Sequence, residues 1–184
     1  IKKEGEIFNV VTPKATYQAR NAMVGIGKMG RPNKPDYKIP FSLNSVINFN
    51  LDACGKGEKI LVVGGGNSAV EYAIELCAYN KTTIAYRRDA FSRVNDTNLE
   101  ALWELEKLDK IKVRLNHDIE ALENESGRVR VYFTNGKKRI YDRVVYAIGG
   151  SSPVDFLQRC GIKTDDKGTP IVSENFESNV TGLY

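Results

Sequence analysis

A short apolar strand, three glycines and an amphipathic helix follow one another without interruption, and few folds accommodate this succession. Residues 59–63 read KILVV, an apolar run without alternation that is typical of a parallel strand buried on both faces. Gly64-Gly65-Gly66 ends the run, and apolar side chains then recur at helical spacing from about Ser68. A second apolar strand over residues 82–86 completes a βαβ unit.

The glycines have the GxGxxG/A spacing of dinucleotide-binding turns, with Gly64, Gly66 and Ala69 at the key positions. The first permits a tight turn, the second lets the backbone approach a pyrophosphate, and the alanine keeps helix and strand close. Free N–H groups at the helix start then face the phosphates. The alternative is a glycine-rich turn without a ligand. The predicted pyrophosphate site consists of Gly64, Gly65, Gly66, Asn67, Ser68 and Ala69.

Arginines follow the second strand, where NAD-selective sites usually place an acidic residue for the ribose 2′-hydroxyl. Arg87 and Arg88 come first and Arg93 follows a few residues later. Guanidinium groups match the oxygens of a 2′-phosphate in bidentate geometry, so the loop favours NADPH. The alternative is a solvated loop in which these arginines pair with Asp89 and Asp96.

Glu71 has two interpretations. With Ser68 it fits a capping box, the serine as N-cap and the glutamate three residues later. It could instead, or in addition, face the nicotinamide pocket, so we include it in the predicted cofactor site.

The remaining pattern completes an α/β fold. A helix is expected over residues 97–108, half-buried strands over 111–115 and 129–133, and a two-residue hairpin turn at Asn135-Gly136. The apolar run 144–148 returns the chain to the buried sheet. We predict a Rossmann-like parallel sheet with helices on both faces, and an antiparallel meander inserted before its last strand.

Proline punctuates the chain before this unit. Gly30-Arg31-Pro32-Asn33-Lys34-Pro35, and then Pro40, indicate a linker because proline fixes φ and removes backbone donors. We therefore expect a fragment over residues 1–45, a nucleotide-binding domain over 46–150 and a return segment over 151–184.

Composition excludes several classes of protein. A net charge of +4 without a basic stripe argues against nucleic acid, and no apolar run is long enough to span a membrane. Three scattered cysteines and one histidine offer no metal cluster and indicate a reducing cytoplasm.

The sequence now resembles a known family. Residues 61–71 (LVVGGGNSAVE) and 86–91 (YRRDAF) are similar to the NADPH domain of low-molecular-weight thioredoxin reductases and their relatives. The resemblance implies that Arg87 and Arg88 hold the 2′-phosphate. Arg93 falls one position after the family's third arginine, where this chain has Ser92, and Tyr86 replaces a histidine.

The resemblance extends along most of the chain. Residues 8–27 are similar to the closing strands of the family's FAD domain, with Gly25-Ile26-Gly27 where Ala-Thr-Gly is common. Residues 144–149 match a strand of the NADPH domain, which adds Ile148 and Gly149 to the cofactor site. The family's first GxGxxG, which binds FAD, is absent. The resemblance thus implies that this chain binds NADPH and that only the full-length protein binds FAD.

Thiol chemistry distinguishes the relatives. Thioredoxin reductases carry a CxxC before the NADPH fingerprint, whereas this chain has the single Cys54 in Cys54-Gly55-Lys56-Gly57. The chain is therefore closer to flavodoxin or ferredoxin NADP reductases, in which FAD accepts hydride from NADPH and passes electrons on to a protein carrier. The alternatives are a thioredoxin- or bacillithiol-type disulfide reductase and a non-catalytic NADP(H)-sensing module. We expect a homodimeric enzyme at full length, an inactive fragment here, and no catalytic residue in this chain.

Overall fold

A computed structural model describes residues 1–26, 32–150 and 153–184. The chain divides into two compact units, Ile1–Arg31 with Gly150–Tyr184, and Pro32–Gly149. The expected first boundary, at residue 45, lies further along the chain than this division, and Leu43 is fully buried in the core of the larger unit. Gly27 and the Gly30-Arg31 start of the predicted linker lie outside the described residues.

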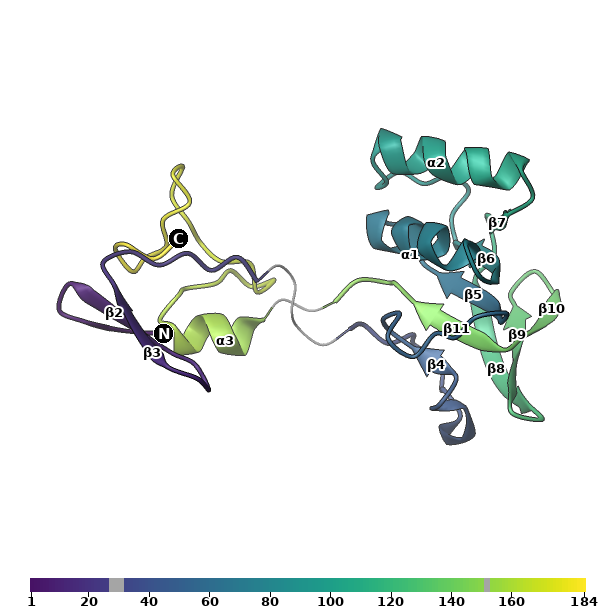
Figure 1. Ribbon diagram of the computed structural model, residues 1–184, viewed down its shortest axis with the longest axis horizontal. Coiled ribbons are helices and arrows are strands. Elements are labelled where there is room, and N and C mark those ends of the chain that lie inside the picture. The colour runs from purple at the N-terminus through teal and green to yellow at the C-terminus, as the bar shows by residue number, and fades with distance from the viewer. Residues whose placement is uncertain (27–31, 151–152) are drawn as a thin grey trace. The chain divides into compact units, whose positions relative to one another are not determined.

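A five-stranded parallel sheet forms the centre of the larger unit (Figure 1). Every pairing in it is parallel, which confirms the predicted Rossmann-like sheet. The central strand carries three side chains with no exposed surface, as its unbroken apolar run requires. In spatial order the strands are β4 (Ile47–Asn48), β11 (Arg143–Tyr146), β5 (Lys59–Val63), β6 (Lys81–Ala85) and β7 (Ile111–Arg114).

Two helices cover one face of this sheet, α1 (Asn67–Cys77) and α2 (Asp96–Lys107). Helix α1 begins within one residue of its predicted start, and α2 begins and ends within one residue of the predicted range 97–108. Val70 and Ala73 of α1 are fully buried against Ile60 and Val62 of β5, which shows that the helical spacing of apolar residues marked the packed side correctly.

An antiparallel meander covers the other face: β8 (Ile119–Glu125), β9 (Arg128–Phe133) and β10 (Lys138–Tyr141). The meander lies before the last strand of the sheet, as predicted. Helices were expected on both faces, but the described residues on this face are those of the meander, the short 3₁₀ helix η1 (Phe41–Leu43) and neighbouring loop side chains such as Tyr37 and Phe49. The alternating strand β9 supplies the apolar face that a helix was expected to supply.

Two different turns connect the meander. Ser126 and Gly127 both have positive φ, 52° and 83°, and form the two-residue turn between β8 and β9. The turn predicted at Asn135-Gly136 is present but longer: residues 134–137 join β9 and β10, and the Phe133 N–H donates to the Lys137 carbonyl. Only Gly136 has positive φ there, so the two-residue form is not adopted.

The smaller unit joins residues from both ends of the sequence. It contains an antiparallel sheet in the order β1 (Lys2–Glu4), β2 (Ile7–Val11), β3 (Thr16–Ala19), and the helix α3 (Val154–Arg159). Phe8 and Leu183 pack together in its core, and Ala22 pairs with Leu183 in a parallel bridge. No helix in the described ranges is both long and apolar enough to cross a bilayer.

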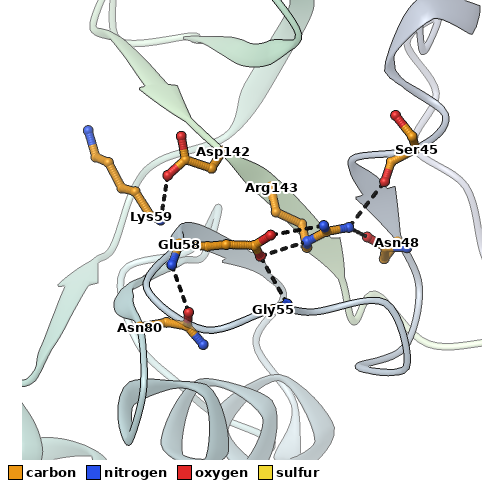
Figure 2. A network of polar contacts seen from close by, with 8 residues as sticks. All are labelled: Ser45, Asn48, Gly55, Glu58, Lys59, Asn80, Asp142 and Arg143. Carbon is orange, nitrogen blue, oxygen red and sulfur yellow. Dashed lines mark hydrogen bonds and ion pairs between the residues drawn. The ribbon is translucent and has the colours of Figure 1, made fainter.

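A polar network connects the amino ends of the parallel strands, at the opposite end of the sheet from the glycine turn (Figure 2). Arg143 of β11 donates through Nη1 to the Ser45 carbonyl at 3.1 Å and to Asn48 Oδ1 at 2.6 Å. The neighbouring Asp142 accepts from the Lys59 N–H at 2.7 Å. Strands β4, β11 and β5 are thus tied together at their amino ends, which sets the register of the strand that leads to Gly64.

Candidate functional site

Gly64 is enclosed by its neighbours. Its N–H donates to the Ala85 carbonyl at 3.1 Å. A Cβ at this position would lie 2.3 Å from the carbonyl oxygen of Ala147 and 2.8 Å from the Cβ of Ala69. Only glycine fits between the ends of β5 and β11 and the start of α1, which agrees with the predicted tight turn and close helix–strand packing.

Gly66, in contrast, faces open space. A Cβ there would meet nothing within 4 Å. Gly66 is the N-cap of α1 and no side chain caps the helix, so the predicted capping box of Ser68 and Glu71 is wrong: Ser68 lies inside the first turn. The Ser68 N–H has no acceptor among the described residues. An uncapped helix start beside an open glycine is the arrangement that an anionic group fits.

Gly65 packs against an aromatic ring. A Cβ at Gly65 would come 2.1 Å from the ring of Tyr86, which is buried and stacks on Phe91 with centroids 5.4 Å apart. The ring of Phe91 in turn lies beside that of Trp103 of α2, with centroids 6.1 Å apart. The loop after β6 is thus held over the glycine turn by its aromatic residues. Sequence reasoning treated Tyr86 only as a substitute for histidine and missed this contact.

The arginine loop lies next to the turn. Gly66 and Arg93 form a parallel bridge, and the Arg88 carbonyl accepts from the Asn116 N–H at 2.9 Å. The side chains of Arg87, Arg88 and Arg93 are exposed. Within the described part of the chain, none of them forms an ion pair. The ion pairs with Asp89 and Asp96 that the alternative interpretation expected are not formed among the described residues, although the loop is solvated, as that interpretation also expected.

The side-chain oxygen of Asn67 accepts hydrogen bonds from other residues of the protein. Oδ1 accepts from the Asn95 N–H at 2.9 Å and from Asn98 Nδ2 at 3.4 Å. Because a backbone N–H must point at an oxygen, the amide orientation is determined, and Nδ2 is left without an acceptor among the described residues. Glu71 is exposed and accepts from Asn98 Nδ2 at 2.9 Å. Its role toward a nicotinamide stays a prediction.

The end of β11 is held by a residue that the sequence placed in the linker. The Asn33 N–H donates to the Gly149 carbonyl at 3.0 Å, and Asn33 Nδ2 donates to the Ile148 carbonyl at 3.3 Å. Gly149 has a φ of 87°, which favours glycine. Ala147, the residue before this predicted pair, is the one that lies against Gly64.

Reactive groups also occur outside the predicted site residues. All three cysteines are free, and burial raises the pKa of the Cys54 thiol. The hydroxyls of Tyr37 and Tyr146 lie 2.6 Å apart, and burial raises the pKa of Tyr146 to about 12. Residues 1–26, 32–150 and 153–184 contain no cluster of three or more side chains able to hold a metal ion.

Known proteins share both the sequence pattern and the fold. Ferredoxin–NADP reductase of Rickettsia bellii is 34% identical over 137 residues, which cover 71% of this chain and 41% of that protein. Coenzyme A disulfide reductase of Staphylococcus aureus is 31% identical over 132 residues, covering 69% and 28%. The chain therefore spans less than half the length of either relative.

Solved structures with the same fold include two reductases. Thioredoxin reductase of T. acidophilum superposes with a TM-score of 0.74 at 21% identity, over 100% of this chain and 62% of that one. Bacillithiol disulfide reductase of Staphylococcus aureus gives 0.65 at 24% identity, over 100% and 58%. The family model for pyridine nucleotide-disulphide oxidoreductases matches residues 1–184. The chain belongs to the pyridine nucleotide-disulphide oxidoreductase family.

Proposed function

We propose that this chain binds NADPH at the glycine turn and the arginine loop, as the nucleotide-binding part of a flavoprotein oxidoreductase. Members of the family depend on FAD and NAD(P)H. The observation that carries the proposal is the juxtaposition of an open, uncapped helix start at Gly66 with an arginine loop bridged to it through Arg93.

The residues of the turn fit a diphosphate. Gly66 leaves room for close approach, and the Ser68 N–H and the α1 dipole supply partial positive charge. Asn67 Nδ2, for which the described part of the chain offers no acceptor, is a further donor beside them. NADH and NADPH both contain the diphosphate, so these protein groups provide affinity without selecting between the two nucleotides.

The arginine loop provides the selection. A 2′-phosphate brings about two negative charges, and guanidinium groups bind its oxygens bidentately. Within the described ranges, neither Arg87 nor Arg88 forms an ion pair that a ligand would have to break. Both side chains are exposed to water, so holding these two positive charges in the unliganded chain costs little desolvation free energy.

In the complete protein, NADPH when bound supplies a hydride, which the flavin accepts and passes on as electrons. This chain's part is to bind and orient, and no acid or base among the site residues is needed. We propose a protein carrier such as ferredoxin or flavodoxin as the final acceptor, because Cys54 has no neighbouring cysteine with which to form a redox pair. We further propose a homodimeric, cytoplasmic complete protein.

A disulfide reductase is the second candidate. Relatives include the coenzyme A disulfide reductase, and the fold is shared with the bacillithiol disulfide reductase. NADPH-dependent reduction of ferredoxin by the complete protein supports the first candidate, and reduction of a low-molecular-weight disulfide supports the second. Nucleotide binding without bound FAD in the complete protein would instead indicate an NADP(H)-sensing module.

Calorimetric titration of the 184-residue chain tests nucleotide binding directly. Replacing both Arg87 and Arg88 by alanine is expected to weaken NADPH binding by at least about 100-fold, since each charged hydrogen bond contributes about 1.5–3 kcal/mol, and to change NADH binding by less than about threefold. Arg139→Ala, an exposed arginine on β10, is the matched control and leaves both affinities unchanged. Equal affinity of the unmodified chain for NADPH and NADH contradicts the proposal.

A further inference from the structure

Asn98 connects the two helices at their amino ends. Its Nδ2 donates to Glu71 Oε1 at 2.9 Å and to Asn67 Oδ1 at 3.4 Å, and both acceptors belong to α1. Its backbone N–H donates to the side chain of Asn95, the N-cap of α2, at 2.8 Å. One partly buried residue thus contacts both helices and the cap between them.

Asn95 closes the arginine loop. Its own N–H donates to Asn67 Oδ1 at 2.9 Å, so the residue that ends the loop is bonded to the residue that follows the glycine turn. The other end of the loop is held by the segment that follows β7, where the Tyr86 carbonyl accepts from the His117 N–H at 3.0 Å. Between these anchors lie Arg87, Arg88 and Arg93.

We propose that the side-chain cluster of Asn67, Glu71, Asn95 and Asn98, called here the amide clamp, sets the separation between the diphosphate turn and the arginine loop and so determines nucleotide selectivity. The inference rests on the proposed NADPH site and adds positioning residues to it. Members of the clamp need not touch the 2′-phosphate, because they act through the loop that carries the arginines.

The physical reason is that NADPH presents its diphosphate and its 2′-phosphate at a spacing set by one ribose. Both can be bound at full strength only if the two protein sites are held at that spacing beforehand, since ordering a loop at the moment of binding reduces affinity. NADH lacks the 2′-phosphate, so its affinity does not depend on where the arginine loop lies. Loosening the clamp should therefore reduce the preference for NADPH and leave NADH binding nearly unchanged.

Titrations of the 184-residue chain with NADPH and with NADH provide the test, with the ratio of the two dissociation constants as the readout. Asn98→Ala is expected to lower the preference for NADPH by about tenfold, the effect of losing one to two hydrogen bonds. Thr97→Ala, an exposed neighbour in the same helical turn, is the matched control and keeps the ratio.

Glu71 supplies a second, independent pair of variants, because its side chain is exposed and its replacement does not disturb the core. Glu71→Gln keeps an oxygen acceptor for Asn98 and is expected to preserve the ratio. Glu71→Ala removes the acceptor and should lower the ratio by about threefold. These variants decide the question even if Asn98→Ala fails to fold.

The outcomes separate the inference from the proposed function. If the unmodified chain prefers NADPH but Asn98→Ala and Glu71→Ala keep that preference, the amide clamp has no role in selectivity and only the inference is overturned. The same holds if these variants weaken both nucleotides equally, as a purely structural helix contact would. If the unmodified chain has no preference, the proposed 2′-phosphate site itself fails.

Discussion

The carboxylate of Glu58 and the guanidinium of Arg143 meet through two parallel hydrogen bonds, 2.8 Å from Nε to Oε2 and 3.0 Å from Nη2 to Oε1 (Figure 2). Only 9% of Arg143 is exposed. Removing the carboxylate leaves a buried cation without its counter-charge. We expect Glu58→Ala to lower the free energy of unfolding by about 3 kcal/mol, measured by urea denaturation.

Glu125→Ala is the control for that experiment. It removes the 2.6 Å ion pair with Arg130. The side chains of Arg130 and Glu125 are 29% and 41% exposed. Solvent screens such pairs, so the loss should stay below about 1 kcal/mol. Equal losses for the two variants would show that burial does not strengthen the Arg143–Glu58 pair.

The same pair predicts how stability depends on pH. Hydrogen bonds from Arg143, together with its positive charge and the Gly55 N–H, hold the pKa of the Glu58 carboxyl below its usual value. A carboxyl with a lowered folded-state pKa stabilises the protein fully above its unfolded-state pKa of about 4.3, and the stabilisation is lost as pH falls through the folded-state value. Glu58→Gln cannot titrate, so its free energy of unfolding should fall less steeply than wild type between about pH 5 and pH 3. Parallel curves for the two proteins would contradict this assignment.

The glycine turn offers a matched pair of substitutions. Gly64→Ala places a Cβ 2.3 Å from the Ala147 carbonyl oxygen, so backbone must move, and we expect a loss of about 3 kcal/mol in the free energy of unfolding. Gly66→Ala meets no protein atom within 4 Å and should change stability by less than about 0.5 kcal/mol. If the diphosphate occupies that open space, Gly66→Ala weakens NADPH binding at least about tenfold. Undiminished NADPH affinity in a folded Gly66→Ala chain would place the ligand elsewhere.

Strand β6 contains a buried hydroxyl without a hydrogen-bond partner among the described residues. Thr82 is 2% exposed, and its Oγ1 has no hydrogen-bond partner among the described residues. Thr82→Val removes this buried polar atom while keeping its shape, and we expect the free energy of unfolding to rise by about 1 kcal/mol. Thr82→Ser is the matched control: it keeps the unpartnered hydroxyl and removes a buried methyl group, so it should lower stability in the same thermal denaturation series. A destabilised Thr82→Val chain would mean that Oγ1 has an acceptor in solution.

The predictable part of the fold was the part encoded locally. Unbroken apolar runs identified β5 and β11 as buried parallel strands, and helical spacing located α1 and α2. The turn at Ser126-Gly127 carries a local signal as well, since serine–glycine pairs favour positive φ, but it passed unnoticed. The cover of the sheet's second face could not be read, because apolar side chains of a helix and of an alternating strand satisfy the same buried surface.

The glycine spacing after a buried strand located the open, uncapped helix start that we propose as the diphosphate site, and the arginines after the next strand determined which charge the neighbouring loop carries. Both are covalent properties of short segments, so the amino-acid sequence contains them outright. Tertiary structure decided the partners of polar side chains: Asn67 Oδ1 bonds Asn95 instead of a ligand, Asn33 holds Gly149, and Glu58 pairs with Arg143. Hydrogen bonds are short-ranged and directional, so a polar side chain takes whichever group the folded chain brings within about 3 Å.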